Sequence, residues 1–213
     1  MKIAVLISGR GTNLQSLIDA HSRGSLLAEI ALVISNVPNV TGLEIASKAG
    51  VPAKTINHKD FPDRRAFEKA LHLALLEAQI EFVCLAGFMR LLTDSFVSEW
   101  ADRVINIHPS LLPSFKGLGT HERALDAGVK FTGCTVHFVR PEMDHGPIIL
   151  QAAVPILPND DIDSLAARVL EQEHIIYPLA VEMIASGRVR IENGQTKIKD
   201  AGIPGACIIN PSS

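Results

Sequence analysis

The chain has 213 residues and a net charge of −3, with 47% hydrophobic and 20% charged residues. A chain of this length buries about 70% of its unfolded surface and suits one globular domain. The charges form no like-signed block, which excludes the basic clusters typical of nucleic-acid-binding proteins. The three cysteines, Cys84, Cys134 and Cys207, are far apart, so neither a disulfide framework nor a zinc site is expected.

The N-terminal segment Met1–Ile7 faintly resembles an export signal. Its apolar run of about five residues is shorter than the 7–15 residues that such a signal needs, so the segment predicts a first strand. No apolar run in the sequence approaches the roughly 20 residues of a membrane span. We therefore expect a cytoplasmic protein with no membrane or nucleic-acid partner.

Short β-branched runs alternate with helical patterns in the first half of the chain. The predicted strands are Lys2–Ile7, Glu29–Ser35, Lys54–Asn57, Glu81–Ala86 and Arg103–Asn106. The predicted helices are Asn13–Ala20, Leu43–Ala49, Asp63–Ala78 and Thr93–Trp100. Continuously apolar strands are typical of parallel sheets covered on both faces, so this alternation predicts an α/β fold with a doubly wound, mostly parallel sheet and flanking helices.

The pattern changes after residue 107. The segment Ile107–Gly119 is rich in Pro, Ser and Gly and predicts a loop. Two long strands follow, at Phe131–Val139 and Pro147–Ile156, and then a helix at Asp161–Ser186 that Pro178 should kink or shorten. Asn193-Gly194 predicts a type I′ turn in a C-terminal β-hairpin of Val189–Glu192 and Gln195–Ile198, and the tail 202–213 is expected to be loose.

A glycine-rich loop follows the first predicted strand and reads Ser8-Gly9-Arg10-Gly11-Thr12-Asn13-Leu14. Small residues let the backbone approach an anion, which the N–H groups and dipole of the following helix then hold. This predicts a phosphate site in the loop, to which Thr12 and Asn13 would add side-chain donors. The alternative is a glycine turn required only for its tightness.

A dinucleotide site is the obvious rival to a monophosphate site in this loop. The third glycine of that fingerprint is replaced by Leu14, and the second strand ends in Ser35-Asn36 where an acidic, ribose-binding residue would stand. The sequence also lacks the GK[ST] of a nucleotide phosphate loop. The expected ligand is therefore a monophosphate.

Asn106 and His108 lie two residues apart at the end of the fifth predicted strand, where ligands of open parallel sheets bind. They point the same way if the extended conformation continues, which Pro109 favours by opposing helix at His108. An amide and an imidazole there can form an oxyanion hole for attack on a carbonyl. The alternative for such a histidine is a structural role.

Asp144 is the third candidate, in the segment Pro141–Pro147. A carboxylate near an imidazole favours the charged ring and can hold a water for proton transfer. The sequence leaves open whether Asp144 meets His108.

Several segments carry a specific resemblance. The segment Asn106–Pro113 (NIHPSLLP), with Asp144–Pro147 (DHGP) at a fitting distance, resembles the signature of the formyltetrahydrofolate-dependent formyltransferases. Within that superfamily, Ile7–Leu14, Leu85–Leu92 and Gln172–His174 before Tyr177-Pro178 resemble phosphoribosylglycinamide formyltransferases. The resemblance covers residues 1 to about 192 and implies the formyltransferase fold.

The resemblance also implies an activity and its residues. A formyl group would move from 10-formyltetrahydrofolate to the amine of glycinamide ribonucleotide in purine synthesis, without a metal. Asn106, His108 and Asp144 would be catalytic, and the ribonucleotide would bind Gly11, Thr12, Asn13 and Glu173. The folate would bind Arg64, Met89, Arg90, Leu91, Leu92, Asn106, Arg140, Pro141, Glu142, Met143 and Asp144.

The resemblance further implies one formyltransferase domain over residues 1–213. Residues 1 to about 100 would bind the phosphorylated substrate, and about 101–192 would carry catalysis and folate binding. We expect a monomer or a weak homodimer. Two positions depart from the family pattern: Leu170 stands where relatives carry polar residues, and Gly119 replaces a side chain near the folate.

Glu173 has support that is independent of the resemblance. It interrupts the apolar stripe of the last predicted helix, which runs through Ile162, Leu165, Val169, Ile176 and Met183. A carboxylate that faces the core needs a partner. Either substrate hydroxyls or an internal salt bridge would supply it, with Arg168 as the candidate for the bridge.

Other functions compete with this interpretation. Methionyl-tRNA formyltransferases carry an added C-terminal domain and formyltetrahydrofolate deformylases an added N-terminal one, and we expect neither here, given the length of the chain and its first strand at Met1. A non-catalytic phosphate-binding module is the rival from a different class. It would need the glycine loop, but not Asn106, His108 and Asp144 together.

Overall fold

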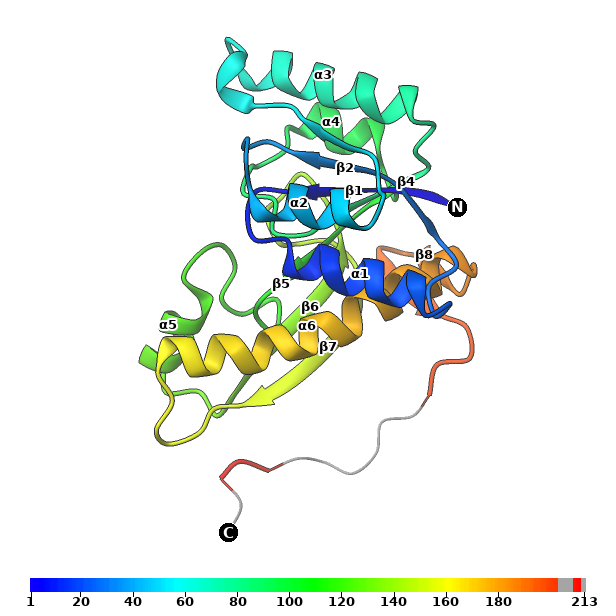
Figure 1. The fold of residues 1–213 in the computed structure, drawn as a ribbon. Helices are drawn as coiled ribbons and strands as arrows, with labels where there is room; N and C mark the ends of the chain where they lie inside the picture. Colours follow the sequence, from blue (N-terminus) through cyan, green and yellow to red (C-terminus); the bar gives the residue numbers. More distant parts are fainter. Residues whose placement is uncertain (203–208, 212–213) are drawn as a thin grey trace.

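A seven-stranded sheet forms the centre of the computed structural model, which describes residues 1–202 and 209–211 (Figure 1). The strand order is β3-β2-β1-β4-β5-β6-β7. The parallel strands are β1 (Lys2–Ile7), β2 (Glu29–Ser35), β3 (Ala53–Thr55), β4 (Phe82–Leu85) and β5 (Val104–His108). The antiparallel strands are β6 (Phe131–Phe138) and β7 (Ile148–Pro155). The predicted doubly wound, mostly parallel α/β sheet is confirmed.

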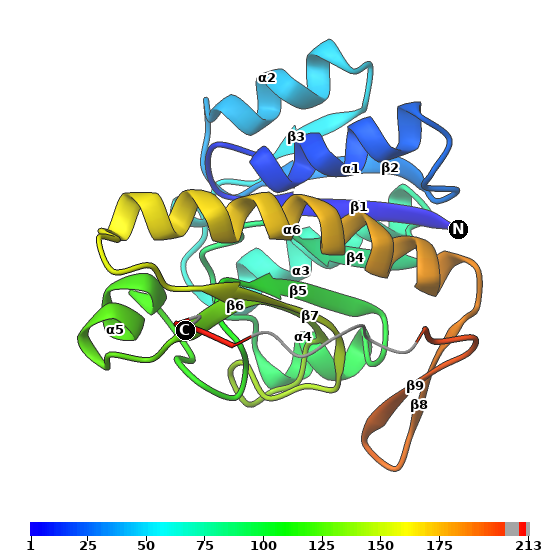
Figure 2. The ribbon, with the colours of Figure 1, turned by 90° about the horizontal axis from the view of Figure 1, so that it is seen from below.

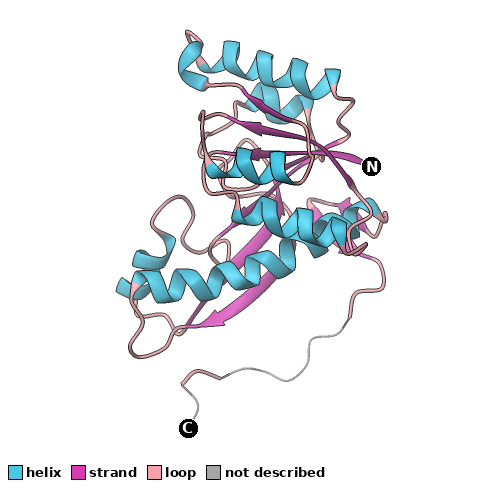
Figure 3. Cartoon of the chain, in the orientation of Figure 1, coloured by secondary structure: helices cyan, strands magenta, loops and turns pink. Residues whose placement is uncertain are grey.

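Helices cover both faces of this sheet (Figures 1 and 3). They are α1 (Thr12–Ser22), α2 (Thr41–Lys48), the 3-10 helix η1 (His58–Asp60), α3 (Arg64–Glu77), α4 (Asp94–Glu99), α5 (Thr120–Asp126) and α6 (Ile162–Ala185). Along β1, Ile3 and Val5 pack in the core with residues of α1 and α6, whereas Ala4 and Leu6 pack with residues of α3 and α4. Burial on both faces explains why this strand is apolar throughout.

The sheet has a topological switch between β1 and β4. The chain proceeds from β1 to β2 and β3 on one side, and to β4 and β5 on the other. Loops that leave the carboxyl ends of β1 and β4 therefore meet over a crevice, where open α/β sheets bind ligands. Ser8 after β1 and Met89 after β4 are joined there, because the Met89 backbone N–H donates to the Ser8 hydroxyl at 2.7 Å.

Three sequence predictions differ from the structure. The strand β5 continues to His108, so the loop expected from Ile107 begins two residues later. The helix α5 was not expected, because its seven residues are too few to show a buried stripe. Pro178 does not shorten α6, which runs 24 residues through it. Buried side chains on both sides, Tyr177 and Val181 among them, hold the helix together across the hydrogen bond that proline cannot make.

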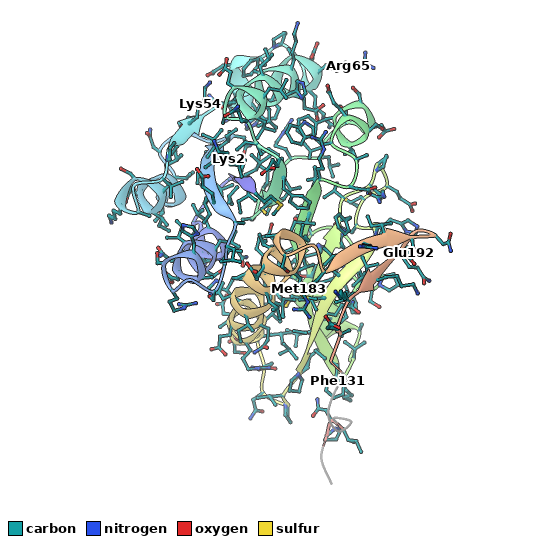
Figure 4. All side chains as sticks on the ribbon, turned by 90° about the vertical axis from the view of Figure 1, so that its right-hand side faces the viewer. Lys2, Lys54, Arg65, Phe131, Met183 and Glu192 are labelled. Atoms are coloured by element: carbon teal, nitrogen blue, oxygen red, sulfur yellow. The ribbon has the colours of Figure 1, made fainter. Side chains whose placement is uncertain are left out.

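The C-terminal hairpin of β8 (Val189–Glu192) and β9 (Gln195–Ile198) has the predicted bounds and register. Asn193 and Gly194 both have positive φ, 51° and 76°, as a type I′ turn requires. The hairpin projects from the body of the molecule, with Glu192 at its far end (Figures 2 and 4). The Thr196 hydroxyl, which donates to the Ile148 carbonyl, ties it to β7.

The predicted loose tail lies partly outside the described residues, as does Cys207. Within the described part, the Asn210 amide donates to the carbonyls of Lys130 and Ile156, at 2.7 and 2.9 Å. That point of the tail is therefore tied to the start of β6 and the end of β7. Cys84 and Cys134 are buried and form no disulfide within the described residues.

Replacing Tyr177 with Phe should destabilise the fold by about 1–3 kcal/mol, because the buried Leu85 carbonyl loses its hydrogen bond from the tyrosine hydroxyl. Urea unfolding followed by circular dichroism measures this. Ser186→Ala is the control, since it removes a hydroxyl–carbonyl bond at the exposed end of α6 and should change stability by less than about 0.5 kcal/mol. Equal losses of stability in the two variants would mean that the buried hydrogen bond from Tyr177 to Leu85 contributes no more than an exposed one.

Candidate active site

A cavity of about 630 Å³ lies beside the carboxyl ends of β4 and β5. Its walls come from the loop after β4, from β5, from residues 117–122 and from the loop between β6 and β7. Apolar side chains such as Phe88, Val97 and Ile162 form much of the lining, and the polar residues in it include Asn106, His108, His137 and Asp144. A cavity of about 300–1,000 Å³ with few convergent polar groups is typical of a small-molecule site.

Asn106 and His108 both lie in β5, so the extended conformation does continue through the pair. They therefore project from the same face of the strand, and both line the cavity. His108 is 5% exposed and Asn106 is half-buried. The two side chains therefore face the same cavity.

The His108 ring has a hydrogen-bond acceptor near each nitrogen. Nε2 lies 3.0 Å from the Phe115 carbonyl oxygen, and Nδ1 lies 3.6 Å from Asp144 Oδ2. A carbonyl only accepts, so Nε2 carries a proton and donates to it. The distance from Nδ1 to the carboxylate is longer than a direct hydrogen bond. Nδ1 is thus the nitrogen that is free to act on a bound molecule.

Asp144 meets His108 from a sharp turn of the β6–β7 loop. Its φ is +50°, a conformation that Asp tolerates better than most residues. The Gly117 backbone N–H donates to Asp144 Oδ2 at 2.8 Å, and Oδ1 lies 3.9 Å from His137 Nε2. The structure therefore brings together the three side chains predicted to be catalytic, with Asp144 between two histidines.

His137 was not predicted to be part of the site. It lies on β6 directly opposite Asn106, and its Nε2 is 3.4 Å from Asn106 Nδ2. Burial lowers the pKa of His137, although the Phe138 carbonyl and Asp144 favour the charged ring. A neutral ring that donates from Nδ1 to the Phe138 carbonyl accepts the Asn106 amide at Nε2. The only signal in the sequence is a histidine inside an otherwise buried strand.

Most of the residues predicted to bind folate line this cavity, namely Met89, Arg90, Leu91, Leu92, Asn106, Arg140, Pro141, Met143 and Asp144. Arg64 lines an adjoining cavity of about 400 Å³ that shares Leu91 and Met143 with the first. Glu142 lines neither cavity, and its side chain is 67% exposed. Its predicted place in the folate pocket is therefore not seen.

Two residues of the cavity lining each have a buried side-chain nitrogen without a hydrogen-bond partner among the described residues. These nitrogens are Arg90 Nε and His121 Nδ1. Burial lowers the pKa of His121, and the charge of His108 lowers it further. His121 was not predicted. Buried polar atoms without a partner are uncommon in folded proteins.

The glycine loop has a structural reason for its second glycine. Gly11 precedes α1 with φ +76°, and a Cβ there would lie 2.6 Å from the Gly42 Cα at the start of α2. Tightness alone thus explains Gly11, and this alternative to a phosphate site remains open. Thr12 begins α1, and Asn13 is buried, with its amide donating to Glu173 at 2.6 Å.

Glu173 faces the interior, as its place in the apolar stripe predicted, and is 7% exposed. Its partner is Asn13 and not Arg168, which pairs with Asp160, so the suggested salt bridge is wrong. Burial raises the pKa of Glu173, which the Asn13 hydrogen bond opposes. Asn13 Oδ1 is also buried and has no partner within the described residues. This pair is available to a further polar group.

The model of the formyl transferase family matches residues 1–181. The chain belongs to this family. It is similar to the phosphoribosylglycinamide formyltransferase of Escherichia coli, at 43% identity over 204 residues that cover 96% of each chain. A glycinamide ribonucleotide transformylase structure from Symbiobacterium toebii superposes with a TM-score of 0.92, at 46% identity over 94% of each chain.

Another relative in the formyl transferase family is much longer. The trifunctional purine biosynthetic protein adenosine-3 of Bos taurus is 53% identical over 195 residues, which cover 91% of this chain. The chain spans 19% of that protein's length. Among the described residues, no helix is long and apolar enough to cross a membrane, and no group of three or more His, Cys, Asp or Glu side chains could hold a metal ion.

Glu173→Gln should stabilise the fold near pH 8 and have little effect near pH 4. A raised pKa means that the stability contributed by protonated Glu173 is fully present below its unfolded pKa, about 4.3. That contribution is lost as the pH rises through the folded pKa. A glutamine side chain is neutral at both pH values. We therefore expect the Tm of Glu173→Gln to exceed that of the wild type by about 2–4 °C near pH 8.

Thermal unfolding at the two pH values measures this effect. Glu171→Gln, on the exposed side of the same helix, is the matched control and should show no such pH-dependent gain. A Glu173→Gln protein that is less stable than the wild type near pH 8 would mean that the buried carboxylate is fully compensated.

Proposed function

We propose that this chain transfers the formyl group of 10-formyltetrahydrofolate to the amine of N1-(5-phospho-D-ribosyl)glycinamide, in purine biosynthesis. The observation that carries the proposal is the group of Asn106, His108 and Asp144 in a mostly apolar cavity. The names of the similar proteins support the same substrate. Because the trifunctional relatives are far longer than this chain, its activity and substrates stand as a proposal.

Each substrate has a place in the proposed complex. The pterin occupies the 630 Å³ cavity, whose lining includes Arg90 and His121, and the rest of the folate extends toward Arg64. The ribonucleotide phosphate binds at Gly11 and Thr12, at the start of α1, where the free N–H groups favour an anion. Its ribose meets the buried Glu173 with Asn13.

The proposed chemistry joins the substrate nitrogen to the formyl carbon and breaks the bond from that carbon to the folate nitrogen. The Asn106 amide has two hydrogens; one is directed at His137 Nε2, and the second donates to the formyl oxygen as it gains charge. His108 donates from Nδ1 to the same oxygen. Asp144 lies 3.6 Å from His108 and, through a water, carries the proton from the attacking amine to the leaving nitrogen.

The alternative functions differ in what they need. A deformylase would use the same three catalytic side chains but pass the formyl group to water. A non-catalytic phosphate-binding module would need only the glycine loop and would leave the His108–Asp144 contact without a purpose. We also propose a cytoplasmic location and a monomer or weak homodimer.

Incubation with 10-formyltetrahydrofolate, with and without the ribonucleotide, tests the proposal. We expect the folate to lose its formyl group only when the ribonucleotide is present, and the formylated ribonucleotide to accumulate. Absorbance measures the loss from the folate, and mass spectrometry identifies the product. Deformylation without the ribonucleotide would instead support a deformylase. Binding of both compounds without turnover would support a non-catalytic module.

Asn106→Ala should lower kcat by about 10²–10³ while KM changes little, because the lost hydrogen bond forms mainly in the transition state. Asn57→Ala is the matched control: this residue caps η1, away from the cavity, and its loss should leave kcat nearly unchanged. Steady-state kinetics with each substrate varied in turn measures both. An Asn106→Ala enzyme with near-normal kcat would remove Asn106 from the mechanism.

A further inference from the structure

We propose that Lys116 is a positioning residue that fastens the β6–β7 loop over the active site and so keeps Asp144 beside His108. The effect of Lys116 on catalysis rests on the proposed function. The contacts of Lys116 with the loop do not depend on that function. We refer to residues 140–146 as the Asp144 loop.

The Lys116 side chain reaches the Asp144 loop on both sides of the aspartate. Its Nζ lies 3.2 Å from His145 Nδ1 and 4.0 Å from Glu142 Oε1. Glu142 Oε2 is in turn 3.6 Å from His145 Nε2, so the three side chains form a closed group. An ammonium has three donors on a flexible stem and can serve both acceptors at once.

The backbone beside Lys116 holds the aspartate itself. The Gly117 N–H donates to Asp144 Oδ2, the same oxygen that faces His108 Nδ1. One residue earlier, the Phe115 carbonyl accepts from His108 Nε2. The segment 115–117 therefore contacts both members of the His108–Asp144 pair through its backbone, while Lys116 ties it to the loop through its side chain.

The segment that carries Lys116 is anchored in its turn to α5. Arg123 of that helix donates to the Lys116 carbonyl at 2.6 Å, and its guanidinium lies 5.7 Å from the centre of the Phe115 ring. Lys116 thus projects from a fixed backbone and not from a free loop tip. A side chain with a fixed base can hold a loop whose own residues are mostly exposed, as Glu142 and His145 are.

The charge of Lys116 also acts in the site. Burial is the main cause of the lowered pKa of His137, and the positive charges of His108 and Lys116 lower it further. The neutral His137 ring is the form that accepts the Asn106 amide. The Lys116 ammonium therefore favours the protonation state that orients Asn106 as well as the loop position that orients Asp144.

Lys116→Met keeps an unbranched side chain one atom shorter and removes its charge, whereas Lys116→Arg keeps both the charge and several donors. Lys54→Met is the matched control, because Lys54 makes a comparable exposed ion pair, 3.8 Å from Glu77, far from the cavity. Two measurements are made on each full-length variant. One is backbone hydrogen exchange in residues 142–146, and the other is steady-state kinetics.

We expect faster exchange in the Asp144 loop of Lys116→Met, by about fivefold, with no change in residues of β1. We also expect kcat/KM for the folate to fall by about fivefold while KM for the ribonucleotide changes less than twofold, since exposed contacts of this kind have modest strength. Lys116→Arg should restore both values, and Lys54→Met should match the wild type.

Exchange in the loop of Lys116→Met within twofold of the wild type would overturn the proposal, and so would a Lys116→Arg protein that behaves like Lys116→Met. If the wild type transfers no formyl group, the proposed function fails. The exchange measurement alone still decides the role of Lys116 in that case.

Discussion

The pairing of β6 with β5 is the constraint on which the candidate site depends. Strands β1 to β5 are parallel, and β6 is the first to run the other way, with His137 directly opposite Asn106. A register shift of one residue would turn every side chain of β6 to the opposite face and remove the imidazole from the amide. The same pairing begins the β6–β7 loop beside β5, so that its turn can return Asp144 to His108. Residues from three separate stretches of chain are thereby fixed against one another.

The close contacts of this region also depend on glycine. A Cβ at Gly146 would lie 1.6 Å from the Phe138 carbonyl oxygen, so the two ends of the β6–β7 loop can meet only without a side chain there. The buried pair of Glu173 and Asn13 also costs stability, because Asn13 Oδ1 is buried and has no hydrogen-bond partner within the described residues. Such sites lower the stability of the free protein and are common where a ligand completes the hydrogen bonding.

The sequence predicted the fold best where burial dictates composition. The strands Lys2–Ile7 and Glu29–Ser35 have the predicted ends, because a strand covered on both faces is apolar along its whole length. The interior position of Glu173 followed from its place in a helical stripe. Its partner Asn13, 160 residues away, could not be inferred, since no local pattern encodes which helices pack together. His137 could not be predicted for the same reason, because its contact with Asn106 follows from strand register and not from its neighbours in sequence.

The contact between Gly11 and Gly42 links the phosphate-loop candidate to α2, which packs with α1 in the same core cluster. With two glycines in direct backbone contact, the loop and the start of α2 have no side chain between them to absorb displacement. The Gly42 N–H also donates to the Gly9 carbonyl. A displacement of α2 would therefore shift the backbone of the loop. A molecule that bound to the outer surface of α2 and tilted the helix would in this way change the shape of the candidate phosphate loop without touching it.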